Sequence, residues 1–250
     1  MSSVTQRINE IKQPRGGYIP VKSLKVAHFE DNRQLYEHEN VSPQYMGVVI
    51  DYLTRLLVTK DPVQAFDIPI VGSGYPHRNK EIIEDLLVQV MNKNLDVCIL
   101  AAFKFVPFDV AYRIGANPNY VRVPVPDKET IHNVAVMAKR GQRYLETHGI
   151  KMTGFYLDGA YTKTIDCGDG DYLTNDAVLD FKVSFKKPNN HYTLQILIYY
   201  LMGMRSIHKE FRNMKKLALF YPRQNIEYSI DIKDIPHSVI DAVEKQVIGY

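Results

Sequence analysis

The sequence predicts an α/β (α+β) protein, with a mainly helical N-terminal region in residues 1–150 followed by strands and a buried helix in residues 151–250. Two observations lead to this division. Apolar residues at helical spacing and helix-capping residues dominate the first region. After Gly149 the chain changes to short runs rich in Thr, Tyr, Val and Ile, separated by polar turns, which is the pattern of strands. The 250 residues are enough for one large domain, or for one domain with a substantial elaboration.

The N-terminal region begins irregularly and then contains one helix with clear boundaries. Residues 1–40 are polar and irregular, and we expect them to be only partly ordered. A helix is predicted over residues 42–58, because Ser42 can cap it and Pro43 suits its first position. Its apolar residues follow at helical spacing: Met46, Val49, Ile50, Leu53 and Leu57.

The remainder of this region is predicted from apolar runs and from the turn residues between them. We expect an extended segment at Phe66–Val71, a turn at Gly72–Gly74 and a helix over about Asn79–Asn92. The long apolar stretch Leu95–Ile114 fits either a buried helix or a strand, and the pattern leaves both open. A further helix is predicted from about Asp127 to His148.

The C-terminal region is expected to order its elements as strands, helix and strands. Residues 152–184 have the composition of a strand meander. His191–Met204 is apolar nearly all round, which indicates a helix buried against a sheet. Two more strands are predicted at Leu217–Tyr221 and Glu227–Ile232, with a turn between them.

The composition excludes several classes of protein. Charged residues make up 24% and hydrophobic residues 45%, so disorder over most of the length is not expected. The longest apolar runs are too short to span a bilayer, and the N-terminus lacks the apolar stretch of a secretory signal. With only Cys98 and Cys167, we expect a reducing, cytoplasmic location and no disulfide framework. The net charge of +3 permits a polyanionic partner.

Asp171, Asp180 and Lys182 are predicted to lie on one face of a β-hairpin. Asn175-Asp176 can form its two-residue turn, because both residue types tolerate a positive φ. Counting outwards from this turn places Asp171 opposite Asp180, with Lys182 on the same face of the strand. A longer loop would shift this register.

Two carboxylates that face each other across a hairpin repel, and a divalent cation would offset that repulsion. Mg²⁺ accepts one or two protein carboxylates and keeps waters and substrate oxygens as its other ligands. Such a metal acidifies a bound water and neutralises charge that grows on a phosphodiester. Lys182 would orient the attacking water or stabilise the transition-state charge. The arrangement suits phosphodiester hydrolysis without an organic cofactor.

Three segments in this order resemble the RecB-like branch of the PD-(D/E)XK nucleases. These are Gly168-Asp-Gly-Asp171, Asp180-Phe-Lys182 and Gln195-Ile-Leu-Ile-Tyr199, which match a Gly-x-x-Asp strand, an Asp-x-Lys strand and a Gln-x-x-x-Tyr helix. The resemblance implies a restriction-endonuclease-like core with a small mixed sheet flanked by helices, a Mg²⁺ or Mn²⁺ cofactor, and DNA as the substrate. An exonuclease is compatible with it, and any ATP-driven unwinding would come from a helicase or another protein partner.

The same resemblance implies a role for each matching residue. Asp171 and Asp180 would bind the metal, the carbonyl of Phe181 would add a ligand, and Lys182 would be the catalytic lysine. Gln195 and Tyr199, one helical turn apart, would lie beside the active site and help to position DNA. In the helix at 42–58, Gly47-Val-Val-Ile-Asp51 matches the spacing of the family's Gly-x-x-x-His, with Asp51 in place of His as a further metal ligand.

Other interpretations compete with this one. Asp169 and Asp166 are alternatives to Asp171, although only odd-numbered positions share the predicted face. Taken alone, Asp180 and Lys182 could form a weak ion pair on a solvated strand, and Gln195 could be a structural amide. Tyr199, or its neighbour Tyr200, could belong to the core, and Asp51 could be an ordinary exposed helix residue.

Basic residues follow the predicted site. Between residues 182 and 216 there are eight Lys or Arg and a single acid, Glu210. Such a stretch suits a phosphate backbone, but it could also be a solvated surface. The alternative functions are a nucleic-acid-binding or assembly module that keeps the fold without catalysis, and a nuclease that acts on RNA.

Overall fold

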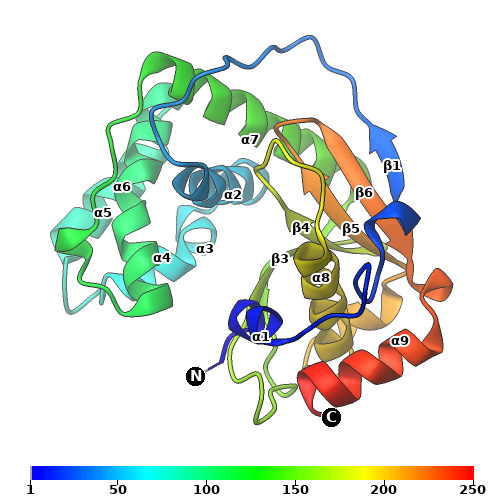
Figure 1. Cartoon of the computed structure of the whole chain (residues 1–250). Coiled ribbons are helices and arrows are strands. Elements are labelled where there is room, and N and C mark those ends of the chain that lie inside the picture. Colours follow the sequence, from blue (N-terminus) through cyan, green and yellow to red (C-terminus); the bar gives the residue numbers. More distant parts are fainter. Residues whose placement is uncertain (1) are drawn as a thin grey trace. The chain divides into compact units, whose positions relative to one another are not determined.

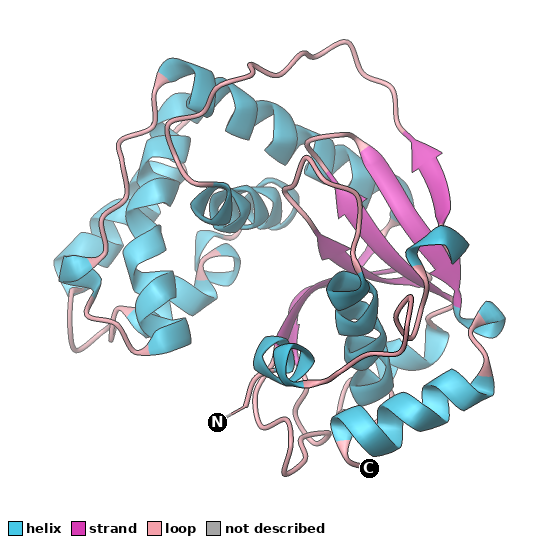
Figure 2. Cartoon of the chain, viewed as in Figure 1, coloured by secondary structure: helices cyan, strands magenta, loops and turns pink. Residues whose placement is uncertain are grey.

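The computed structural model describes residues 2–250, and within them the chain forms nine α-helices and one six-stranded mixed sheet (Figure 1, Figure 2). The N-terminal half is mainly helical, as the sequence predicts. Two compact units divide the chain: a helical unit, Asp31–Thr147, and a sheet unit, which joins the described residues up to Glu30 with His148–Tyr250. Along residues 2–250, no helix is both long and apolar enough to cross a membrane.

The predicted boundaries of the best-defined helix are confirmed in the helical unit. Helix α2 spans Pro43–Thr59, and the Ser42 side chain caps it by accepting a hydrogen bond from the Tyr45 amide. The other long helices are α5 (Lys80–Val90), α6 (Leu95–Ile114) and α7 (Lys128–His148). The ambiguous apolar stretch is thus helix α6. It is apolar nearly all round because it is buried.

The extended segment predicted at Phe66–Val71 is wrong. Helix α3 (Pro62–Ala65) is followed directly by α4 (Asp67–Gly72). The Asp61 carboxylate accepts hydrogen bonds from the Val63 and Gln64 amides and so begins α3. The buried Phe66 ring stacks on Phe105 of α6, with 4.5 Å between ring centroids. Tertiary packing and a local cap therefore override the strand-like composition of this short segment.

The sheet unit has the strand order β1-β6-β5-β4-β3-β2, in which only the β4–β5 pair is parallel. The strands are β1 (Lys25–His28), β2 (Ile150–Tyr156), β3 (Asp169–Thr174), β4 (Ala177–Phe181), β5 (Lys216–Tyr221) and β6 (Ile226–Asp231). Helix α8 (Asn190–Gly203) joins the two parallel strands, because a parallel connection needs a crossover. The predicted C-terminal order of strands, helix and strands is confirmed. After β6, α9 (His237–Ala242) continues as a π-helix, Val243–Ile248.

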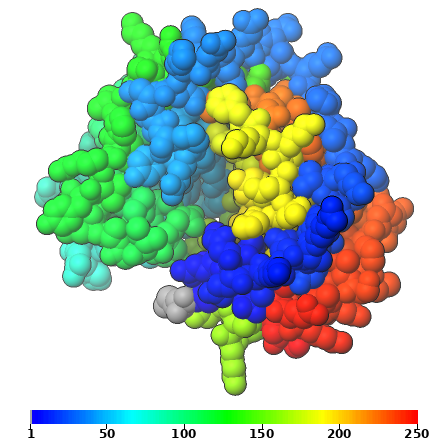
Figure 3. Space-filling model, viewed as in Figure 1, coloured from blue at the N-terminus to red at the C-terminus, as the bar shows by residue number. Residues whose placement is uncertain are grey.

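The N-terminal residues differ from the predicted division, because residues 2–30 are ordered and belong to the sheet unit. Strand β1 extends the sheet beside β6, and helix α1 (Val4–Glu10) packs near α8 with Val4 and Ile8 buried. In Figure 3 the dark blue N-terminal segment lies on the surface beside the yellow segment around the start of α8. The Thr193 hydroxyl of α8 donates to the Ile19 carbonyl and holds this segment in place.

The main core of the sheet unit lies between one face of the sheet and α8. Residues at alternate strand positions, such as Val178 and Leu217, point to this face and are buried with Leu194 and Ile198 of the helix. Gly170 allows close packing at its edge, because a Cβ at that position would lie 2.0 Å from the Phe155 ring. This core gives α8 a fixed position against β4 and β5.

Candidate metal-binding and catalytic site

The register predicted for the β3–β4 hairpin is confirmed. Tyr172 pairs with Leu179 and Leu173 with Val178, and the same count places Asp171 across from Asp180. The reason given for the turn is wrong, because neither of its two residues has a positive φ. Other contacts hold the turn: the Thr174 hydroxyl accepts the Ala177 amide at 3.1 Å, and the Asn175 amide donates to the Gly149 carbonyl at 3.1 Å.

Strands β3 and β4 separate at the two carboxylates. If the ladder continued, the Phe181 amide would donate to a main-chain carbonyl of β3. Instead it donates to Oδ2 of Asp171 at 2.7 Å. The Asp171 side chain thus bridges the two strands where their main chains diverge, and it is held beside the peptide that links Asp180 to Phe181.

Lys182 lies at the centre of the site. Its Nζ is 2.5 Å from Oδ2 of Asp180, and the two side chains are only 16% and 5% exposed. The same Nζ donates to Oε1 of Gln195 at 2.9 Å, and Nε2 of Gln195 donates to the Tyr199 hydroxyl at 3.0 Å. Asp180 and Lys182 of the hairpin are therefore connected to Gln195 and Tyr199 of α8 in one polar network.

The carboxylates keep Lys182 in its cationic form. Burial by itself would lower the pKa of Lys182, but the charges of Asp180 and Asp171 outweigh burial, and the pKa lies above its ordinary value of 10.5. An ammonium at neutral pH can stabilise negative charge but cannot accept a proton. Burial, with the nearby charges of Asp169 and Asp180, also raises the pKa of the Tyr199 hydroxyl well above its ordinary value, so Tyr199 stays neutral.

The contacts of Asp171 favour it over Asp166, and Asp169 stays an alternative carboxylate. Asp171 contacts the Phe181 amide, and its charge raises the pKa of Lys182. Asp166 lies in the loop before β3, where Oδ1 accepts the Ser2 amide at 2.8 Å. Asp169, at the start of β3, also acts on this site, because its charge contributes to the raised pKa of Tyr199.

Two tyrosines near Lys182 were not among the predicted site residues. The Tyr192 ring centroid lies 4.7 Å from Lys182 Nζ, which is a cation–π distance. Tyr221, at the end of β5, is fully buried, and burial together with the charges of Tyr192 and Asp180 raises its pKa. Tyr192 could have been found from its spacing, because it precedes Gln195 by three residues on α8. Tyr221 has no such signal, because it reaches the site only through the β4–β5 pairing.

Asp51, the predicted further metal ligand, lies on α2 in the helical unit. Its Oδ2 is 2.8 Å from the guanidinium of Arg55, whose side chain is 3% exposed. This ion pair joins residues one turn apart on the same helix. A contribution of Asp51 to the metal site stays a prediction.

Several of the basic residues after β4 already have partners. Lys182 pairs with Asp180, Arg205 with Glu244 at 3.2 Å, and Lys216 with Glu227 at 3.2 Å. Lys186 and Lys187, in the loop between β4 and α8, are exposed. The stretch is therefore not a uniform basic surface, and Lys186 and Lys187 are its exposed basic residues nearest to Lys182 in sequence.

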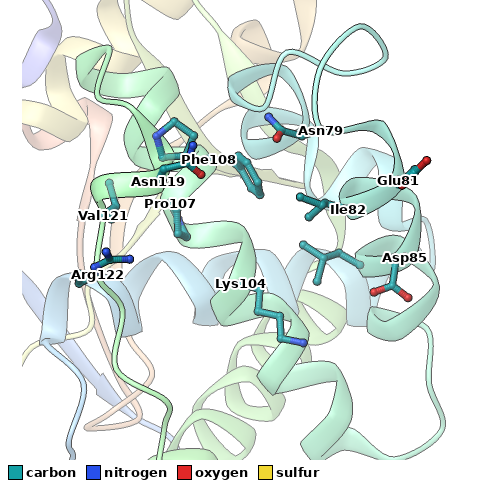
Figure 4. A pocket seen from close by; sticks show the side chains of 12 residues that line it. Asn79, Glu81, Ile82, Asp85, Lys104, Pro107, Phe108, Asn119, Val121 and Arg122 are labelled. Atoms are coloured by element: carbon teal, nitrogen blue, oxygen red, sulfur yellow. The ribbon is translucent and has the colours of Figure 1, made fainter.

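The helical unit contains a separate hollow of about 590 Å³ (Figure 4). Opposite charges line it, with Glu81 and Asp85 from α5 and Lys104 from α6, over an apolar wall that includes Phe108. None of the predicted site residues lines this hollow. Its mixed charge does not suggest one class of ligand.

Comparison of the chain with models of known protein families found no match. Searches against curated proteins and against solved structures also found no significant match. A functional proposal for this chain therefore depends on its own residues and their geometry.

Proposed function

We propose that this chain is a metal-dependent nuclease of the PD-(D/E)XK type, RecB-like branch, which hydrolyses DNA phosphodiester bonds. The observation that carries the proposal is the junction where β3 and β4 separate. There two carboxylates from neighbouring strands, Asp171 and Asp180, meet a buried lysine from the Asp-x-Lys segment. The resemblance assigns Gln195 and Tyr199 to the same site: Gln195 accepts a hydrogen bond from that lysine and donates one to the Tyr199 hydroxyl.

The donor set fits Mg²⁺ or Mn²⁺. Among residues 2–250, no group of three His, Cys, Asp or Glu side chains could hold a metal, which argues against a site built from side chains alone, such as structural zinc. A magnesium ion needs only one or two carboxylates, with main-chain and water oxygens as its other ligands. Asp171, Asp180 and the Phe181 carbonyl would be those ligands, and Asp51 is a proposed addition. When bound, the metal would acidify a water and neutralise charge on the phosphate.

The protein residues would divide the remaining work among them. The Lys182 ammonium is buried and cationic, so it would stabilise the charge of the transition state rather than act as a base. Gln195 holds Lys182 in position through its amide oxygen and is itself held by Tyr199. With Asp180 as its other partner, Lys182 has a fixed position before substrate binds.

The setting of this activity is also a proposal. Lys186 and Lys187 would contact the phosphate backbone, because they are exposed and lie close in sequence to the catalytic lysine. Free thiols at Cys98 and Cys167 suit a cytoplasmic, reducing compartment. An exonuclease that acts with a helicase partner is one role that fits this site.

The proposal is tested by incubating the protein with plasmid, linear duplex and single-stranded DNA in Mg²⁺ or Mn²⁺. We expect the wild type to cleave at least one of these substrates. Asp180→Asn keeps the size of the side chain but removes its charge. We expect this variant to cleave at roughly one hundredth of the wild-type rate or more slowly.

The chain offers a matched control in Asp231-Ile232-Lys233, which repeats the Asp-x-Lys spacing at the end of β6. Asp231 forms a surface ion pair with Lys25 at 2.7 Å, away from the β3–β4 junction. Asp231→Asn should therefore cleave at the wild-type rate. Equal cleavage by the wild type and Asp180→Asn, or no cleavage of any substrate, would contradict the proposed function.

A further inference from the structure

An aromatic side chain is exposed in the loop that leads from the catalytic lysine to α8. Phe185 is 67% exposed and lies only three residues after Lys182. The next two residues, Lys186 and Lys187, are also exposed. Because burying a phenylalanine is favourable, a ring left this open beside two cations suggests contact with a ligand that is both aromatic and anionic.

The ring is held in place from beneath. The guanidinium of Arg223, in the turn between β5 and β6, lies 4.2 Å from the centroid of the Phe185 ring, and Arg223 is only 5% exposed. A second contact fixes the loop, because Nε2 of Gln224 donates to the Ser184 carbonyl at 2.9 Å. One face of the ring is thus covered by a buried cation, and the loop main chain is tied to the neighbouring turn.

We propose that Phe185, Lys186, Lys187 and Arg223 form a stacking platform for single-stranded DNA. An unpaired base would stack on the open face of Phe185, while the two lysines contact the adjoining phosphates. The supporting guanidinium strengthens such a stack through its own cation–π contact. In a duplex the bases are already paired and stacked, so their faces are not open to this ring.

This inference rests on the proposed function, and it specifies the substrate. Phe185 follows Lys182 by three residues. Three residues of extended chain span about 10 Å, which is the length of one or two nucleotides in an extended single strand. A strand whose base stacks on Phe185 would present a nearby phosphodiester to Asp171, Asp180 and Lys182. The enzyme would then act on single strands or on single-stranded ends.

Binding can be measured without cleavage, by fluorescence anisotropy of a labelled single-stranded oligonucleotide in EDTA. We expect Phe185→Ala to bind roughly 5- to 150-fold more weakly, which is the range for loss of one base–aromatic stack. Phe185→Tyr keeps the ring and should bind like the wild type. Ile207→Ala is the matched control, because Ile207 is also 67% exposed but follows the opposite end of α8.

The lysines contribute charge rather than stacking, so their effect should depend on salt. A plot of log affinity against log salt concentration has a negative slope, of which each phosphate contact of a single strand contributes roughly 0.7. For the double variant Lys186→Ala/Lys187→Ala, this slope should become shallower by about 1.4. Circular dichroism checks that every variant keeps the wild-type fold.

Equal binding by wild type and Phe185→Ala would overturn the platform, and so would an equally large effect of Phe185→Ala on binding to duplex DNA. The proposed function is judged separately. Cleavage that depends on Asp180 but not on Phe185 would leave the nuclease standing without the platform. Binding that depends on Phe185, without cleavage in any metal, would support the platform and reject the nuclease.

Discussion

Asp31 is the group in the helical unit whose charge we expect to contribute most clearly to stability. Its carboxylate accepts two hydrogen bonds from the Arg140 guanidinium, at 2.9 and 2.8 Å, and its side chain is 5% exposed. These bonds to Arg140, with help from Arg33, lower the pKa of Asp31 from its ordinary value of 3.8 to about 2. At about 1.4 kcal/mol for each pKa unit, this difference corresponds to about 2.5 kcal/mol of folding free energy.

The sign and pH range of this contribution follow from the lowered pKa. The stabilisation is fully present above pH 3.8, where the unfolded carboxyl is ionised, and is lost as the pH falls through about 2. Asp31→Asn should therefore lower the free energy of unfolding by about 2.5 kcal/mol at neutral pH. The measurement is urea unfolding followed by circular dichroism. At about pH 2.5, the difference in unfolding free energy between the wild type and Asp31→Asn should be only about a third as large.

Asp96→Asn provides the control, because Asp96 is an exposed acid in the first turn of α6. It should change the unfolding free energy by no more than about 0.5 kcal/mol. An equal loss for Asp31→Asn at neutral pH and at about pH 2.5 would refute the reasoning. Such a result would mean that the side chain stabilises the fold by its shape or packing and not by its charge.

Other consequences of the structure can be measured. Gly170→Ala should lower the unfolding free energy by about 1–3 kcal/mol, because the new Cβ would meet the Phe155 ring at 2.0 Å; wild-type stability in urea would contradict this. Gln195→Leu should slow DNA cleavage roughly 10- to 100-fold, because the amide that positions Lys182 is lost. An unchanged kcat would show that this amide has only a structural role. Mn²⁺ at about 100 times its Kd should raise the unfolding free energy of the wild type by about 2.7 kcal/mol, and that of Asp180→Asn by much less. Equal stabilisation of the two proteins would mean that the metal binds elsewhere.

The candidate site could be predicted in part because its residues belong to two local patterns. Asp171, Asp180 and Lys182 lie on one hairpin, and strand alternation with a two-residue turn is enough to bring them together. Gln195 and Tyr199 lie one turn apart on one helix, which fixes their relation to each other. The link between hairpin and helix, from Lys182 to Gln195, depends on how α8 packs on the sheet, and in the sequence only the family resemblance suggested it.

The parts of the fold that were mispredicted depend on contacts distant in sequence. Phe66–Val71 has a composition that suits a strand, but Phe66 packs on a ring of α6 and the segment is helical. Residues 2–30 look irregular by themselves, because their order comes from β6 and α8, about 170 to 200 residues later in the sequence. Local propensity cannot predict such partners.

The sequence by itself determined the helical first half, the C-terminal strands around one buried helix, and the register that places Asp171 opposite Asp180. Each of these follows from periodicity or from counting across a turn, which are properties of neighbouring residues. Only the tertiary structure decided that β3 and β4 separate at those carboxylates, so that the Asp171 side chain takes the Phe181 amide. It also brought Tyr221 near Asp180 and Arg223 beneath the Phe185 ring, because these contacts join segments that are distant in sequence.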